Sequence, residues 1–241
     1  MSAKARPRLG LIVAASVILS VTLLGLPTQQ VAAHCPGSQA SGGRDYAAGK
    51  RSIANSANGI KADIQYTLKP VCAIPAGNAF SAEAIYLCIN SLCDGFVQVG
   101  WERSQSGTLR MYCEFQPPPA TGTGFIFYFS VTAATHNYKM QYDPLDSVWD
   151  CFLDGAWKKD KGGLGFTTGT YLGAQGETNS THTQLGRNSP STLQYTTLQY
   201  RIAMNNTWNT WSPNTFTRDP PYGASNPAVG SFADWTNVPH N

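Results

Sequence analysis

The chain has 241 residues, of which 17 are Lys or Arg, 14 are Asp or Glu and only 13% are charged. Three of the cations, Lys4, Arg6 and Arg8, precede an apolar run over residues 11–26, so the rest of the chain carries 14 cations and 14 anions. Phosphate recognition needs a basic stripe, which this balance lacks. The composition therefore argues against a nucleic acid as the partner.

Residues 1–33 have the pattern of a secretory signal peptide. A basic segment is followed by the apolar run, and Val31-Ala32-Ala33 places small residues where a signal peptidase cleaves. Pro27 and the small residues after it favour cleavage after Ala33 over an uncleaved membrane anchor. We expect a secreted, soluble and monomeric product, without a membrane span, whose roughly 200 residues suit one β domain.

The six cysteines all follow the expected cleavage site. An even number of cysteines in an exported chain predicts disulfides, although six cysteines allow about 15 connectivities. Cys88–Cys93 is the simplest pair because its loop is short and flanked by strands, and Cys113–Cys151 and Cys35–Cys72 then follow by elimination. The four histidines are scattered and no Cys-x-x-Cys is present, so we expect neither a metal site nor a cofactor.

The chain in order predicts a flexible arm over residues 34–58 and then a single β domain over residues 59–241 with an irregular C-terminal tail. Residues 125–132 form the most apolar predicted strand, which we expect to be central, and residues 158–165 are expected to form a loop. The predicted strands cover 63–68, 84–90, 95–101, 108–116, 125–132, 138–142, two pieces within 148–157 around an Asp154-Gly155 turn, 167–178 and 193–204.

Helix signals are nearly absent beyond the leader, and turn residues recur about every 8–12 residues. This pattern predicts an all-β fold. The long strands favour a two-sheet antiparallel β-sandwich of the jelly-roll or concanavalin-like type with one concave sheet.

Gln98 stands in the middle of the strand-forming segment Gly95–Trp101. A buried amide needs hydrogen-bonding partners, so Gln98 is either a satisfied structural amide or a group aimed at a ligand. Glu114 and Glu177 are each the only charge within an otherwise uncharged stretch of strand, for which an outward-facing position is the simple alternative. No Gly-x-Ser-x-Gly elbow occurs, and paired cysteines leave no thiol nucleophile.

Two short segments resemble the glutamic peptidases. Val97 to Trp101 reads Val-Gln-Val-Gly-Trp and resembles the first catalytic strand, where fungal members carry Gln-x-Gly and plant neprosin-like members carry Glu-Ala-Gly-Trp. Gly176-Glu177-Thr178, followed by Gln184-Leu185-Gly186, resembles the neprosin pattern of Gly-Gly-Glu-Val and a later Met-Gly. The resemblance spans residues 82–201, but the chain has Gln where neprosins have Glu, and it lacks the Trp-rich signature of the fungal enzymes.

The resemblance implies an acid endopeptidase with Gln98 and Glu177 as a catalytic dyad acting on a polypeptide. Glu177 would take a proton from a water molecule as general base, and the Gln98 amide would stabilise the oxyanion. We expect the substrate groove to include Trp101, Glu114, Tyr128, Tyr171 and Gln175.

Two other classes remain open. A concave sheet lined with aromatic side chains is also how lectin-like sandwiches bind glycans, and the chain could instead be a secreted structural or adhesive protein without catalysis. The candidate stacking residues are Trp101, Tyr112, Tyr128, Tyr138, Tyr142, Trp149, Trp157 and Tyr171. The peptidase hypothesis requires Gln98 and Glu177 to face each other on one open groove.

Overall fold

The computed structural model describes residues 40, 43–75, 77–120, 122, 124–186 and 189–236, within one compact unit, Ala33–Asn241. The predicted signal peptide 1–33 and Cys35 lie outside the described residues. In the described part of the chain, no helix has the length and apolar character needed to cross a membrane. The strands are β1 (Asp45–Gln65), β2 (Phe80–Cys88), β3 (Phe96–Ser104), β4 (Leu109–Gln116), β5 (Phe125–Ser130), β6 (Thr135–Asp143), β7 (Val148–Leu153), β8 (Ala156–Gly162), β9 (Gly169–Thr178), β10 (Tyr195–Ile202), β11 (Trp208–Thr210), β12 (Thr215–Arg218), β13 (Tyr222–Ser225) and β14 (Ala233–Thr236).

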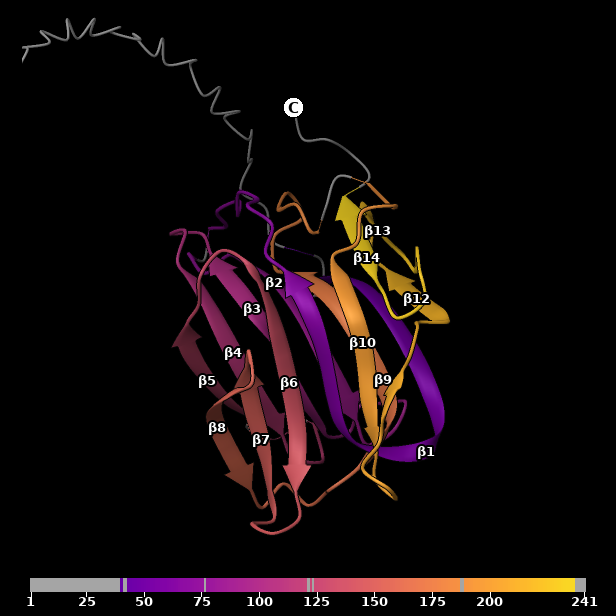
Figure 1. Cartoon of the computed structure of the whole chain (residues 1–241). Coiled ribbons are helices and arrows are strands. Elements are labelled where there is room, and N and C mark those ends of the chain that lie inside the picture. The colour runs from indigo at the N-terminus through magenta and orange to yellow at the C-terminus, as the bar shows by residue number, and fades with distance from the viewer. Residues whose placement is uncertain are drawn as a thin grey trace, which may run out of the picture. The chain divides into compact units, whose positions relative to one another are not determined.

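Strand β1 joins two parts of one continuous 12-stranded antiparallel sheet, and these parts form the two layers that we call the groove sheet and the covering sheet. Its first half pairs with β9 and β12, and its second half pairs with β6 and β10, with a break in register between Ser52 and Ala57. The groove sheet has the order β5-β4-β3-β2-β9-β1-β12, and the covering sheet has the order β8-β7-β6-β1-β10-β11. Figure 1 shows β6, β7 and β10 of the covering sheet in front of the strands of the groove sheet. The predicted all-β, two-sheet antiparallel fold is therefore confirmed.

The prediction of a flexible arm over residues 34–58 was wrong for residues 45–58, which lie in β1. This part of β1 is rich in small residues, and Ile53 is its only large aliphatic side chain, so no apolar alternation marks a strand in the sequence. Small residues are needed here because a Cβ atom on Gly49 would come within 2.8 Å of Pro213 and Phe232. Ala47 and Ala57 on the same strand are also fully buried.

The β7–β8 hairpin confirms the predicted turn at Asp154-Gly155, where φ is 51° and 79°. Positive φ at both central residues is typical of the tight turns that match the twist of a hairpin. Strand β8 continues to Gly162, so most of the loop predicted over residues 158–165 is strand instead.

Strand β5 was predicted to be central, but it lies at the edge of the groove sheet. Its Phe side chains are covered by the aliphatic stems and ammonium groups of lysines on β8. Lys161 Nζ lies 4.2 Å from the ring centre of Phe125, and Lys159 Nζ lies 4.9 Å from that of Phe127. The apolar character of β5 therefore reflects closure of the sandwich at this edge.

The core lies between the two sheets. It contains Val97, Val99 and Trp101 from the groove sheet and Tyr138 and Trp149 from the covering sheet. The Cys113–Cys151 disulfide joins β4 to β7 across this core, and Cys88–Cys93 closes the short loop after β2. Both predicted pairings are confirmed.

Candidate functional site

The outer face of the groove sheet holds two adjoining cavities of about 450 Å³ and about 260 Å³. Four residues line both cavities: Arg44, Gln98, Glu114 and Glu177. We call these four residues the polar centre and the two cavities together the groove. The polar centre combines two carboxyl groups, an amide and a guanidinium.

Strand alternation explains why these side chains face the groove. Side chains along a strand point alternately to opposite faces of the sheet. On β3, Val97 and Val99 point into the core while Gln98, between them, points outward. On β9, Ala174 is in the core and Glu177, three positions later, faces the groove.

Glu177 is held by two side chains from the same face of the sheet. Arg44 Nη1 donates to its Oε1 at 2.5 Å, and Gln175 Nε2 donates to its Oε2 at 3.1 Å. Burial raises the pKa of the Glu177 carboxyl, and the positive charge of Arg44 opposes this rise. Arg44 therefore favours the ionised form that a general base requires.

Gln98 is oriented by Tyr112 of the neighbouring strand. Gln98 Nε2 donates to Tyr112 Oη at 2.5 Å. Tyr112 packs on Ala82 and Ala84 of β2, and burial raises the pKa of its hydroxyl well above the usual value. The phenol is thus neutral and acts only as a hydrogen-bonding group. One N–H of the Gln98 amide engages Tyr112, which leaves the second for a ligand.

Glu114 stands directly opposite Gln98 in the β3–β4 ladder. Directly opposed residues have their Cβ atoms about 4.5–5.5 Å apart. Burial and the negative charge of Glu177 raise the pKa of Glu114 to about 7, against the opposing charge of Arg44. A substantial fraction of Glu114 is therefore protonated at neutral pH, and nearly all of it in mild acid.

Gln98 and Glu177 line the same groove without touching. Strand β2 lies between β3 and β9, and the ladder aligns Gln98 with Tyr86 and Gly173, four residues before Glu177 on β9. Glu177 is aligned instead with Ala82, whose small side chain forms part of the floor of the larger cavity. The two groups thus approach the same space from different positions along the strands.

Of the five predicted groove residues, Glu114 lines both cavities, Tyr128 lines the larger cavity and Gln175 lines the smaller one. Tyr171 lines neither of these two cavities. The prediction for Trp101 was wrong, because this side chain is buried in the core and packs edge-on against Tyr66 at 5.1 Å. Trp101 is three positions from Gln98, so strand alternation excludes a common face.

Arg44 is the member of the polar centre that sequence reasoning missed, because it lies in the predicted arm. Arg44, Tyr46, Ala48 and Lys50 all line the smaller cavity. Their alternating spacing was a strand signal in the sequence, but the small residues between them hid it.

The aromatic side chains proposed as sugar-stacking faces are mostly not in the groove. Trp101, Trp149 and Tyr138 are buried in the core, which corrects that prediction for these three. Tyr128 is 42% exposed at the groove, but Arg110 already covers one face of its ring at 3.6 Å. Among the described residues, no group of three or more His, Cys, Asp or Glu side chains could hold a metal ion.

No protein-family model matches the chain, and no curated protein matches it in sequence. Solved structures do match it in fold. One is Scytalido-glutamic peptidase with a peptide-based transition-state analogue, at 8% identity and a TM-score of 0.51, covering 80% of this chain and 98% of that chain. Another is SCP-B, a member of the eqolisin family of peptidases in complex with the tripeptide Ala-Ile-His, at 6% identity, a TM-score of 0.51 and the same coverages. At such low identity the likeness concerns the fold alone, and the chain is similar in fold to glutamic peptidases.

Proposed function

We propose that this protein is a secreted acid endopeptidase in which Glu177 and Gln98 act on a water molecule and a peptide bond. The observation that carries the proposal is that both side chains line the same two cavities on the outer face of the groove sheet. The fold likeness to peptidases supports it, as does the early and late placement of the two segments in the chain. The further likeness to neprosin-like members rests on the sequence segments only.

The proposed chemistry uses the groups that the groove presents. The Glu177 carboxylate, kept ionised by Arg44, takes a proton from water as the water oxygen attacks the carbonyl carbon. The free N–H of Gln98 donates a hydrogen bond to the developing oxyanion. Neither step requires a metal ion or a covalent intermediate.

The position of the polar centre favours cleavage within a chain over removal of a terminal residue. The larger cavity extends from the centre toward Phe80, Ser104 and Tyr128, and the smaller cavity extends toward Tyr86 and Phe96. A polypeptide lying across both cavities would have residues bound on each side of the scissile bond. The aromatic walls of the smaller cavity suit a large apolar side chain.

A direct test compares the wild-type protein with Glu177→Gln in hydrolysis of an unfolded protein substrate between pH 3 and pH 7. We expect internal cleavage by the wild type in acid and a loss of about 10²–10⁴-fold in kcat for Glu177→Gln, with unchanged thermal unfolding. Mass spectrometry of the products identifies internal or terminal cleavage. Wild-type protein without peptide hydrolysis at any pH would reject the proposal, as would full activity in Glu177→Gln.

The carbohydrate-binding alternative rests on Tyr128, which is 42% exposed at the groove. A glycan array distinguishes it from the peptidase proposal. Glycan binding that is lost in Tyr128→Ala, together with absence of proteolysis, would favour the sugar-binding function.

A further inference from the structure

Glu114 differs from Glu177 in how its carboxyl group is held, although both lie in the polar centre. The Glu177 carboxyl is engaged by Arg44 and Gln175. In the described part of the chain, no residue donates a hydrogen bond to the Glu114 carboxyl, which is nevertheless partly buried and reaches both cavities. A buried carboxyl group without partners is costly as an anion, whereas a neutral acid is cheaper and carries a proton to donate.

The charged and titratable groups around Glu114 reinforce this difference. Burial and the negative charge of Glu177 raise its pKa to about 7, and the Arg44 charge is the opposing influence. The groups facing Glu114 from the surrounding elements are Arg44 before β1, Tyr46 on β1, Glu102 and Gln98 on β3, Tyr112 on β4, Tyr128 on β5 and Glu177 on β9. Arg44 contacts Glu177 directly, so the cation favours ionisation of Glu177 first. Two carboxyl groups whose environments separate their protonation states are suited to act as a base and an acid.

We infer that Glu114 is a second catalytic carboxyl group, which donates the proton to the leaving amine while Glu177 acts as the base. This inference rests on the proposed peptidase function and deepens it. It follows from the position of Glu114 directly opposite Gln98, the residue whose amide would hold the oxyanion. A group there lies beside the carbonyl carbon and the nitrogen of the same peptide bond.

The proton and electron balance closes with these groups alone. The water oxygen forms a bond to the carbonyl carbon, Glu177 receives the water proton, and the carbonyl electron pair moves to the oxygen held by Gln98. When the intermediate collapses, the C–N bond breaks, its electron pair goes to nitrogen and Glu114 gives nitrogen its proton. Glu177 is then protonated and Glu114 ionised, and proton exchange with solvent restores the starting state.

The test uses the leaving group as the probe. A peptide amide needs a proton on its leaving nitrogen, whereas the nitrophenolate of a peptide p-nitrophenyl ester leaves without one. We expect Glu114→Gln to lower kcat for the peptide by about 10²–10⁴-fold with little change in KM, while ester hydrolysis stays near the wild-type rate. Glu177→Gln should lose both reactions, because each requires activated water.

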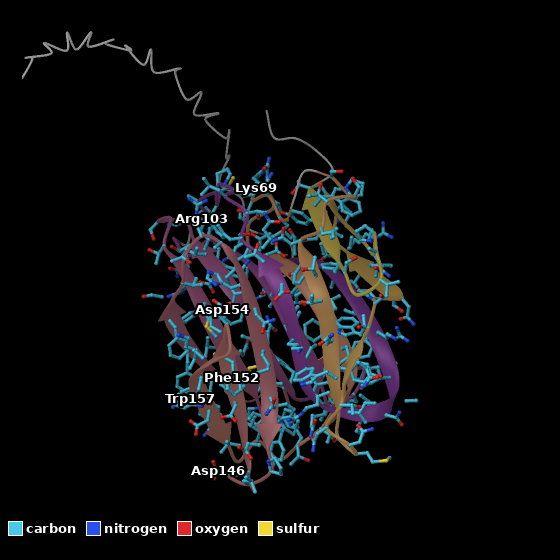
Figure 2. All side chains as sticks on the ribbon, viewed as in Figure 1. Lys69, Arg103, Asp146, Phe152, Asp154 and Trp157 are labelled. Atoms are coloured by element: carbon cyan, nitrogen blue, oxygen red, sulfur yellow. A yellow bond between two sulfur atoms is a disulfide. The ribbon has the colours of Figure 1, made fainter. Side chains whose placement is uncertain are left out.

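The pH dependence gives a second readout that a structural role would not move. Wild-type peptide hydrolysis should fall as the pH rises through about 7, where Glu114 ionises, and the residual activity of Glu114→Gln should lack this limb. Glu114→Asp keeps a carboxyl group and should keep the limb at reduced rate, which covers the case in which Glu114→Gln fails to fold. Asp146→Asn is the control, because Asp146 lies on the β6–β7 turn at the lower end of the view in Figure 2 and lines neither cavity.

The possible results distinguish a failure of the proposed role of Glu114 from a failure of the proposed peptidase function. Active wild-type protein whose Glu114→Gln variant loses peptide and ester hydrolysis equally, or keeps the wild-type pH profile, overturns the role of Glu114 alone. Wild-type protein without peptide hydrolysis overturns the proposed function and this inference with it.

Discussion

Two pairs of carboxyl groups lie on opposite faces of the groove sheet. Glu177 and Glu114 face the groove, whereas Glu83 of β2 and Asp234 of β14 are fully buried on the core side. Glu83 accepts a hydrogen bond from the Gly186 amide at 3.0 Å, and its other oxygen lies 2.7 Å from the Tyr195 hydroxyl. Glu177 and Glu114 are therefore accessible to a ligand in the groove, whereas Glu83 and Asp234 are enclosed by other residues of the protein.

Protonation makes the core pair a structural element. The Tyr195 hydroxyl also lies 2.5 Å from the Gln175 carbonyl oxygen, and its single proton serves only one of these two acceptors. A protonated Glu83 supplies the second proton, in agreement with its pKa, which burial and the charge of Asp234 raise well above the usual value. The difference shows that Glu83, sealed in the core with Gly186 and Tyr195 as partners, is inaccessible to a ligand, whereas Glu177 and Glu114 line cavities that can receive one.

The largest expected effect is a loss of stability when one carboxyl group of the core pair is removed. Glu83→Ala leaves the buried Gly186 amide without its acceptor and removes a hydrogen-bond partner of the Tyr195 hydroxyl, and each buried polar group left unpaired costs about 1–3 kcal/mol of unfolding free energy. Urea unfolding at pH 5 measures it. Glu83→Gln is the matched control, since its amide still accepts from Gly186 and donates to Tyr195. Equal stability of wild type and Glu83→Ala would contradict the assignment.

The next largest expected effect is a loss of activity when Gln98 in the groove is replaced. Gln98→Ala removes the proposed oxyanion donor and should lower kcat by about 10²–10³-fold, while urea unfolding changes little because Gln98 supports no core contact. Gln116→Ala is the control, because Gln116 is an amide on β4 that hydrogen-bonds the Pro117 carbonyl and lines neither cavity. A stability loss in Gln98→Ala as large as that in Glu83→Ala would show that the two faces do not divide their roles.

The third effect is the pH dependence of stability. Burial raises the pKa of Asp234 to about 7 in the folded state, compared with about 3.9 for an unfolded aspartate. The folded form therefore binds this proton more tightly, so stability is greatest below about pH 4 and falls as the pH rises through about 7. Urea unfolding at a series of pH values measures the slope, which Asp234→Asn should flatten. Stability that rises over this interval would reject the sign.

The smallest expected effect is a change in the pH dependence of activity when Arg44, the cation that contacts Glu177, is replaced. Arg44→Gln removes the cation that opposes the raised pKa of Glu177, so the acid limb of activity should move to higher pH. Arg44 is 55% exposed at its side chain, and ion pairs with an exposed partner contribute about 0–1 kcal/mol, so stability should hardly change. Arg44→Lys should restore part of the shift. An unmoved acid limb would remove Arg44 from the control of Glu177.

Local sequence patterns predicted much of the fold and part of the site. Strand alternation and turn residues such as Asp154-Gly155 led to the two-sheet fold. The short loop between Cys88 and Cys93 led to that disulfide, and Cys113–Cys151 followed by elimination. Strand alternation also explains why the prediction of Trp101 as a groove residue was wrong, because Trp101 is three positions from Gln98 and points to the opposite face of the sheet. Local patterns failed over residues 45–58, where small residues replace the apolar signal because Pro213 and Phe232 of the C-terminal segment pack closely on Gly49 of β1.

The sequence by itself determined which residue types are available: an amide and two glutamates on strands, paired cysteines and few charges elsewhere. Only the tertiary structure decided their partners. Arg44 reaches Glu177 across 133 positions of sequence, and Glu114 faces Gln98 through the β3–β4 register. Pairing between distant strands depends on the packing of the whole sandwich, because local alternation selects a face of a strand but not its neighbour. That pairing decides which glutamate contacts the cation and which one carries the proton.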